Sequence, residues 1–80
     1  MPTVFGAGPY RFYFYSHEPN EPPHVHVDRE NWSAKFWVQP VGLAFNLGFN
    51  ARELNKVQSL VEEHQKALLE AWHGHFGTRG

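Results

Sequence analysis

One eight-residue segment, EPPHVHVD at residues 21–28, constrains the fold of this chain most strongly. Two prolines restrict the backbone at its start, and polar residues then alternate strictly with valines. Because successive side chains of a β-strand point to opposite faces, a strand here places its valines on one face and its polar side chains on the other. The valine face requires a hydrophobic core. The polar face, which carries His24, His26 and Asp28, is the candidate functional surface.

Further strands are predicted on both sides of this segment. Residues 10–15, YRFYFY, are rich in aromatic side chains that favour strands. Their alternation turns two phenylalanines inward and gives an outer face of Arg11, Tyr13 and Tyr15. Residues 33–38, SAKFWV, predict the strand that returns beside the histidine segment. Alternation at 43–47 indicates a fourth strand or an irregular packed segment, and residues 1–9 read as an arm that docks by its side chains or forms a short edge strand.

The register between the histidine segment and the returning strand follows from their patterns. In one register both valines face apolar residues of the returning strand, and the polar faces then coincide. This register places Lys35 opposite His26 and Trp37 opposite His24. A shift by one residue would mix apolar and polar side chains on both faces, so we expect the first arrangement.

From Asn50 onward, apolar residues recur at steps of three and four, the period of an amphipathic helix. Asn50 and Glu53 have the spacing of an N-cap and its third helical residue, which allows both side chains to satisfy free backbone amides. The apolar stripe consists of Leu54, Val57, Val61, Leu68 and Trp72. The sequence therefore predicts a single α+β domain, residues 1–80, in which a two-layer arrangement packs a three- or four-stranded antiparallel meander against one long C-terminal helix.

Composition excludes several classes of protein. The 80 residues contain no cysteine, which rules out disulfides, thiolate metal sites and a thiol nucleophile. We expect a cytoplasmic protein without membrane contact, because no apolar run approaches the roughly 20 residues of a membrane span and the start lacks the pattern of a signal peptide. Seven Lys and Arg against eight Asp and Glu give a net charge of −1, so any contact with a polyanion must be local.

The predicted outer face combines residue types that bind or cleave RNA. Two imidazoles can act as general base and general acid near neutral pH, a cation can hold the phosphate, and exposed rings can stack on unpaired bases. A metal-independent ribonuclease would use as its catalytic residues His24, His26 and Lys35. The residues that bind the RNA would be Arg11, Tyr13, Tyr15 and Trp37.

Two other interpretations remain open. In the first, a small metal-binding protein uses His24 and His26 as ligands for zinc, nickel or copper, with further ligands sought among Asp28, His73 and His75. In the second, the histidines only form hydrogen bonds within the sheet, and the same face binds a partner protein, since Tyr, Trp and Arg dominate interface hot spots. The sequence predicts no bound cofactor and leaves the oligomeric state open.

Five segments resemble a family of small bacterial proteins of unknown function: PTVF, GPYRFYFYS, EPPHVHV, AKFW and EAWHGHFG. The resemblance covers nearly the whole chain, and EPPHVHV is its most specific part. Members of that family resemble components of toxin–antitoxin-type gene pairs. The resemblance therefore implies a small cytoplasmic protein whose partner is the second small protein of the pair, encoded by the neighbouring gene, and it implies no catalytic residue.

Overall fold

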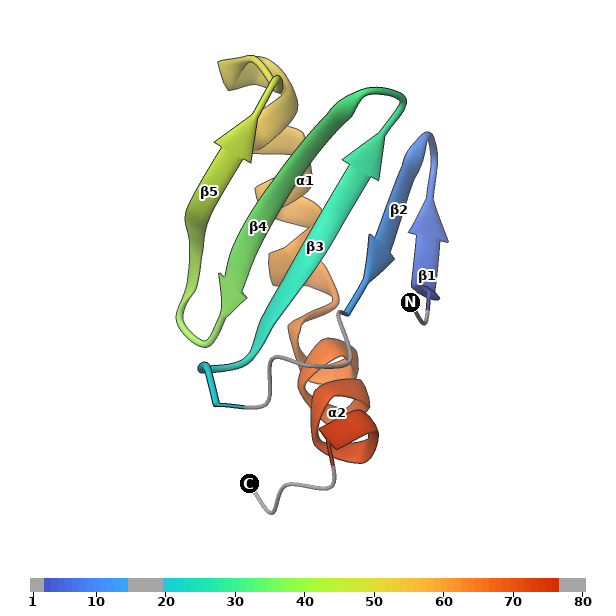
Figure 1. Ribbon diagram of the computed structural model, residues 1–80, viewed down its shortest axis with the longest axis vertical. Helices are drawn as coiled ribbons and strands as arrows, with labels where there is room; N and C mark the ends of the chain where they lie inside the picture. Colours follow the sequence, from blue (N-terminus) through green and yellow to red (C-terminus); the bar gives the residue numbers. More distant parts are fainter. Residues whose placement is uncertain (1–2, 15–19, 77–80) are drawn as a thin grey trace.

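The computed structural model describes residues 3–14 and 20–76, with side chains described for residues 6–14 and 20–74. Its elements are β1 (Thr3–Ala7), β2 (Tyr10–Tyr13), β3 (His24–Arg29), β4 (Trp32–Val38), β5 (Val41–Leu47), α1 (Ala51–Glu63) and α2 (Gln65–Phe76). The strands form one antiparallel sheet in sequence order, and α1 crosses one face of it (Figure 1). The predicted α+β class is confirmed, but the structure has five strands and two helices.

The fifth strand is β1, which the sequence suggested only as an arm or a short edge strand. It pairs with β2 from Thr3 opposite Tyr13 to Ala7 opposite Tyr10, with an irregularity between Thr3 and Phe5. The connecting turn contains Gly8 at φ +58°, a conformation that glycine adopts without steric cost. This turn allows the chain to reverse within two residues.

The predicted register between β3 and β4 is confirmed. His26 lies opposite Lys35, and His24 lies opposite Trp37. Both valines of β3 are fully buried beneath this pairing. Strand β2 adds Tyr13 opposite His26 on the other side, so the alternation of the sequence positions the candidate site as expected.

The core lies between the sheet and the helices. Its central side chains are Phe12, Phe14, Val25, Val27, Phe36, Val38, Val57, Val61, Leu68 and Trp72, all at most 2% exposed. The helical stripe read from the sequence supplies the last four of these side chains. Of that stripe only Leu54, in the first turns of α1, is partly exposed.

The predicted long helix is interrupted at His64, where φ is −105° and ψ is 16°. The His64 Nδ1–H donates to the carbonyl oxygen of Leu60 at 2.9 Å. Immediately afterwards, the Gln65 side-chain amide donates to the carbonyl oxygen of Val38 at 2.7 Å, which ties the start of α2 to the end of β4. Helix α2 therefore leaves the line of α1 and lies at the end of the sheet where β3 begins (Figure 1).

The start of α1 is joined to the sheet by Glu53. The Glu53 backbone N–H donates to Asn50 Oδ1 at 2.8 Å, which confirms the predicted N-cap. The Glu53 carboxylate instead accepts hydrogen bonds from the Tyr10 hydroxyl and, at 3.0 and 3.1 Å, from the Arg29 guanidinium. The Tyr10 hydrogen bond holds the pKa of Glu53 below its usual value, whereas burial raises the pKa of Tyr10. One carboxylate thus links β2, β3 and α1.

Within the described ranges, neither helix is long and apolar enough to cross a membrane.

Candidate functional site

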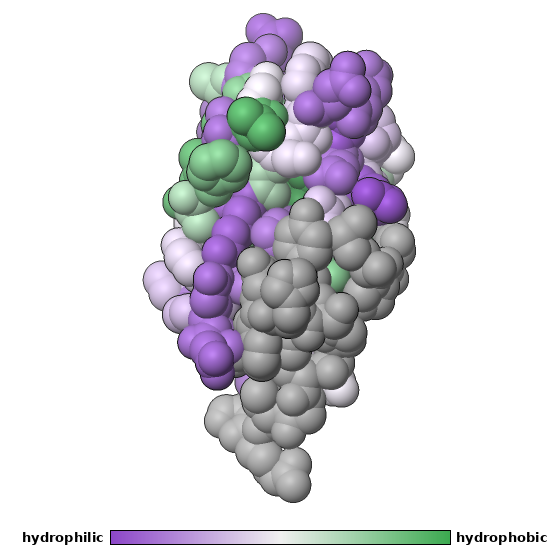
Figure 2. Space-filling model, in the orientation of Figure 1, coloured by the Kyte–Doolittle hydropathy of each residue, from purple (hydrophilic) through white to green (hydrophobic). Residues whose placement is uncertain are grey.

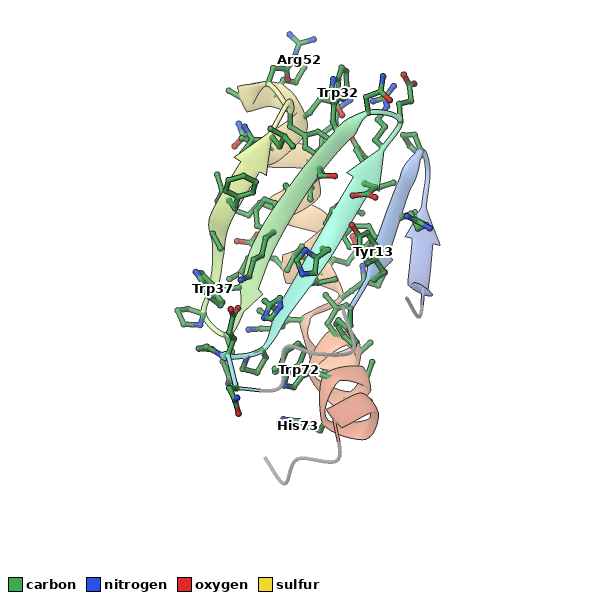
Figure 3. The ribbon with its side chains drawn as sticks, viewed as in Figure 1. Tyr13, Trp32, Trp37, Arg52, Trp72 and His73 are labelled. Carbon is green, nitrogen blue, oxygen red and sulfur yellow. The ribbon has the colours of Figure 1, made fainter. Side chains whose placement is uncertain are left out.

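Most of the described side chains proposed from the sequence lie on the face of the sheet that points away from α1. We call this the outer face and define it by Arg11, Tyr13, His26, Asp28, Ser33, Lys35 and Trp37. Figure 3 shows Tyr13 on β2 and Trp37 on β4, at the two sides of β3. The alternation of three neighbouring strands brings these residues together, as the sequence predicted.

Asp28 organises one end of the outer face. Its carboxylate accepts hydrogen bonds from the Tyr13 hydroxyl at 3.0 Å and from Ser33 Oγ at 2.7 Å. It also accepts a charged hydrogen bond from Arg11 Nη2 at 3.2 Å. Arg11 and Asp28 thus form an ion pair between the neighbouring strands β2 and β3. The charge of Arg11, which the RNA hypothesis requires for phosphate, is already compensated by a neighbouring carboxylate.

Tyr13 lies on the predicted face but does not present an exposed ring. Its ring stacks on that of His26, with 5.4 Å between the centroids and 21° between the planes. The Arg11 guanidinium lies 4.9 Å from the Tyr13 centroid, and the ring is only 4% exposed. The expectation that Tyr13 offers a free stacking platform is therefore wrong, because its neighbours already cover it.

His24 differs most from its expected environment, since its side chain is fully buried. Its ring centroid lies 4.8 Å from Trp72 of α2, 5.2 Å from His26 and 5.9 Å from Trp37. His24 Nδ1 lies 2.9 Å from the carbonyl oxygen of Pro22. Because a carbonyl oxygen can only accept a hydrogen bond, Nδ1 carries the proton and donates it. The expected exposure of His24 is wrong. The chain changes direction at His64, between α1 and α2, and α2 therefore brings Trp72 over the first residue of β3.

Lys35 and Trp37 lie on the outer face of β4. The Lys35 ammonium forms an ion pair with Glu21, and its nitrogen lies 4.9 Å from the Trp37 ring centroid, a cation–π distance. Only 18% of the Lys35 side chain is exposed. Both predicted cations of this face are thus engaged with carboxylates.

The metal hypothesis finds a pair of histidines but no complete ligand set. The rings of His24 and His26 lie edge to face at 84°. In residues 3–14 and 20–76, no group of three or more His, Asp or Glu side chains is arranged to hold a metal ion. Asp28 is occupied by the three donors described above. Tyr15 and the side chain of His75, both named from the sequence, lie outside the described residues.

The sequence did not identify the exposed apolar side chains of β5 as part of the site. Leu43, Phe45 and Leu47 are 45%, 58% and 59% exposed. In Figure 2 a hydrophobic patch is visible on the side of the molecule that β5 forms. Their alternation suggested a packed strand. Alternation alone does not distinguish a covered strand from a strand at the edge of the sheet.

A groove of about 500 Å³ runs over the outer face beside these residues. Phe45 and Leu47 line one side of it. The remaining lining comes from Tyr13, His26, Ser33, Ala34 and Lys35. The groove therefore combines an apolar wall with a polar wall whose charges are paired, which suits contact with a protein surface.

Together these features define the class: a small α+β domain with a five-stranded antiparallel meander, helices on one face and a grooved outer face. The chain belongs to a family described as a domain of unknown function (DUF4160), whose model matches residues 10–73. Neither the curated proteins nor the solved structures give a significant match to the chain.

Proposed function

We propose that this protein is a cytoplasmic protein-binding module of a toxin–antitoxin-type two-gene system. Its outer face and β5 bind the second small protein of the pair, which the neighbouring gene encodes. The observation that supports this proposal most is the exposure of Phe45 and Leu47 at 58% and 59% beside the groove. Exposed apolar side chains next to a concave surface are characteristic of protein interaction sites.

The electrostatics of the outer face favour a protein over a polyanion. Arg11 is paired with Asp28, and Lys35 is paired with Glu21. Phosphate binding would have to compete with both carboxylates and would gain little from a chain with a net charge of −1. A neutral protein surface can bind without displacing either carboxylate from its cation.

RNA binding is the second candidate function. The observation that favours it is the position of Lys35 beside the half-buried Trp37 ring, on the same face as the exposed Phe45. A single-stranded base can stack on such rings. Cleavage by His24, His26 and Lys35 is less well supported than binding, because the buried His24 ring already donates its Nδ1–H to a backbone carbonyl. The remaining alternative is a small metal-binding protein that uses His24 and His26 as ligands and binds neither RNA nor a partner protein.

Co-expression tests the proposed function. The chain is produced together with the protein encoded by the adjacent gene, with an affinity tag on one of the two, and the complex is analysed by size-exclusion chromatography. We expect a stable complex that Phe45→Glu disrupts. The matched control is Ala67→Glu, which adds the same charge at an exposed position of α2. Co-elution unaffected by Phe45→Glu, or the lack of any complex, would refute the proposal.

A further inference from the structure

Strand β5 forms one edge of the sheet. In the sheet that the structure describes, it pairs with β4 along one side only. Every second residue of an edge strand directs its backbone N–H and C=O away from the sheet, where another strand can bind them. Edge strands are commonly protected by charged side chains, but β5 has the sequence VGLAFNL and carries no charge.

A bulge in β5 places exposed apolar side chains on both faces of this edge. Leu43 lies opposite Phe36 of the core, and Phe45 lies opposite Lys35 of the outer face. Ala44, between them, has no partner in β4. Because directly opposite residues in an antiparallel pair point to the same face, Leu43 lies on the helix side and Phe45 on the outer side. Both remain substantially exposed, at 45% and 58%.

We infer that β5 receives an extended segment of the partner protein as a sixth strand of the sheet. This inference rests on the proposed function and specifies how the partner binds. A strand presents side chains to both faces, so it covers Leu43 and Phe45 at once while its backbone pairs with the outer edge of β5. A partner that lay only on the outer face would leave Leu43 in contact with water.

The bulge also indicates which kind of chain fits the edge. In a two-fold pair of two copies with fully overlapping β5 strands, Leu43 of one copy would lie opposite Phe45 of the other. These residues point to different faces, so in this fully overlapping register the two bulged strands are out of phase with each other. Strand β4, which has a regular alternation of core and outer side chains, already fits the inner side of the bulge. The occupant we infer is therefore a regular segment of a different protein, with apolar side chains that pack on Leu43 and Phe45.

The test uses the co-expressed complex and two variants on opposite faces of β5. Amide hydrogen exchange across residues 41–47 should slow by about tenfold or more in the complex relative to the chain alone, since strand pairing protects backbone amides. Leu43→Asp and Phe45→Asp should each weaken the complex by about tenfold or more, whereas Ala67→Asp should not. The fold of each variant is checked by its own circular dichroism and exchange pattern.

The outcomes separate the two proposals. A complex in which exchange at residues 41–47 is unchanged, or one that Leu43→Asp leaves intact, overturns strand addition but leaves the protein-binding function in place. Self-association of the chain alone that Phe45→Asp abolishes, measured by analytical ultracentrifugation, shows that a second copy occupies the edge and also overturns the inference. Failure to form any complex overturns the proposed function and strand addition together.

Discussion

The Trp72 and His24 rings lie 4.8 Å apart, so the second helix closes over the first residue of the histidine-bearing strand. This contact divides the two histidines of the motif into different roles. His24 is a buried side chain of the junction between sheet and helix, and His26 stays on the outer face against Tyr13. The motif is therefore partly a structural element, and the surface that remains for binding is shifted toward β4 and β5.

Removal of the Trp72 ring should destabilise the protein strongly. Trp72 is 2% exposed and also packs edge to face on Phe14 at 5.4 Å. We expect Trp72→Ala to lower the free energy of unfolding by about 3–5 kcal/mol, because it leaves a cavity over two buried rings. Urea denaturation followed by circular dichroism measures this change. Trp72→Phe keeps an aromatic ring and should cost clearly less; equal losses for both variants would show that the ring contact is unimportant.

Any side chain at Gly48 should destabilise the protein. Its φ is +107°, and a Cβ atom would lie 2.6 Å from Trp32 Cδ1. We expect Gly48→Ala to destabilise the fold by about 1–3 kcal/mol through backbone strain and displacement of the Trp32 ring. Gly42→Ala, where a Cβ meets nothing within 4 Å, serves as the control in the same thermal melts. Equal melting temperatures for the two variants would contradict the close approach of Gly48 to the Trp32 ring.

Glu53 should make the stability depend on pH in the acid range. The Tyr10 hydrogen bond and the Arg29 pair hold the pKa of Glu53 below its usual 4.5 in the folded state. Its ionised form therefore stabilises the fold above pH 4.5, and this contribution is lost as the pH falls through the lower, folded-state pKa. Glu53→Gln should lower the melting temperature near neutral pH and flatten the decline toward acid. If the melting temperatures of wild type and variant fell by the same amount as the pH was lowered, this role of the carboxylate would be contradicted.

The sheet was the most predictable part of this molecule. A period of two along residues 24–28 and 33–38 allows one register that keeps valines with apolar partners, and the structure has that register. The N-cap at Asn50 was predictable for a similar reason, because a local side-chain hydrogen bond fixes the start of a helix. These features depend on residues close in sequence or on strict alternation.

What could not be predicted depends on contacts between distant segments. The burial of His24 follows from the turn at His64, which a continuous helical period does not reveal. The exposure of Phe45 follows from the position of β5 at the edge, which is decided by β1 pairing with β2 at the other side of the sheet. Tyr13 was placed on the correct face, but its covering by Arg11 and His26 depends on side-chain contacts within and between two paired strands, β2 and β3.

The central claim, that the outer face and β5 bind a protein, is tested most directly by isothermal titration. The purified chain is titrated with the protein encoded by the adjacent gene, using wild type, Phe45→Glu and Ala67→Glu. We predict a defined complex whose Kd rises by about tenfold or more for Phe45→Glu and stays within about twofold for Ala67→Glu. No measurable binding of the wild type, or the same Kd for all three chains, would contradict the account.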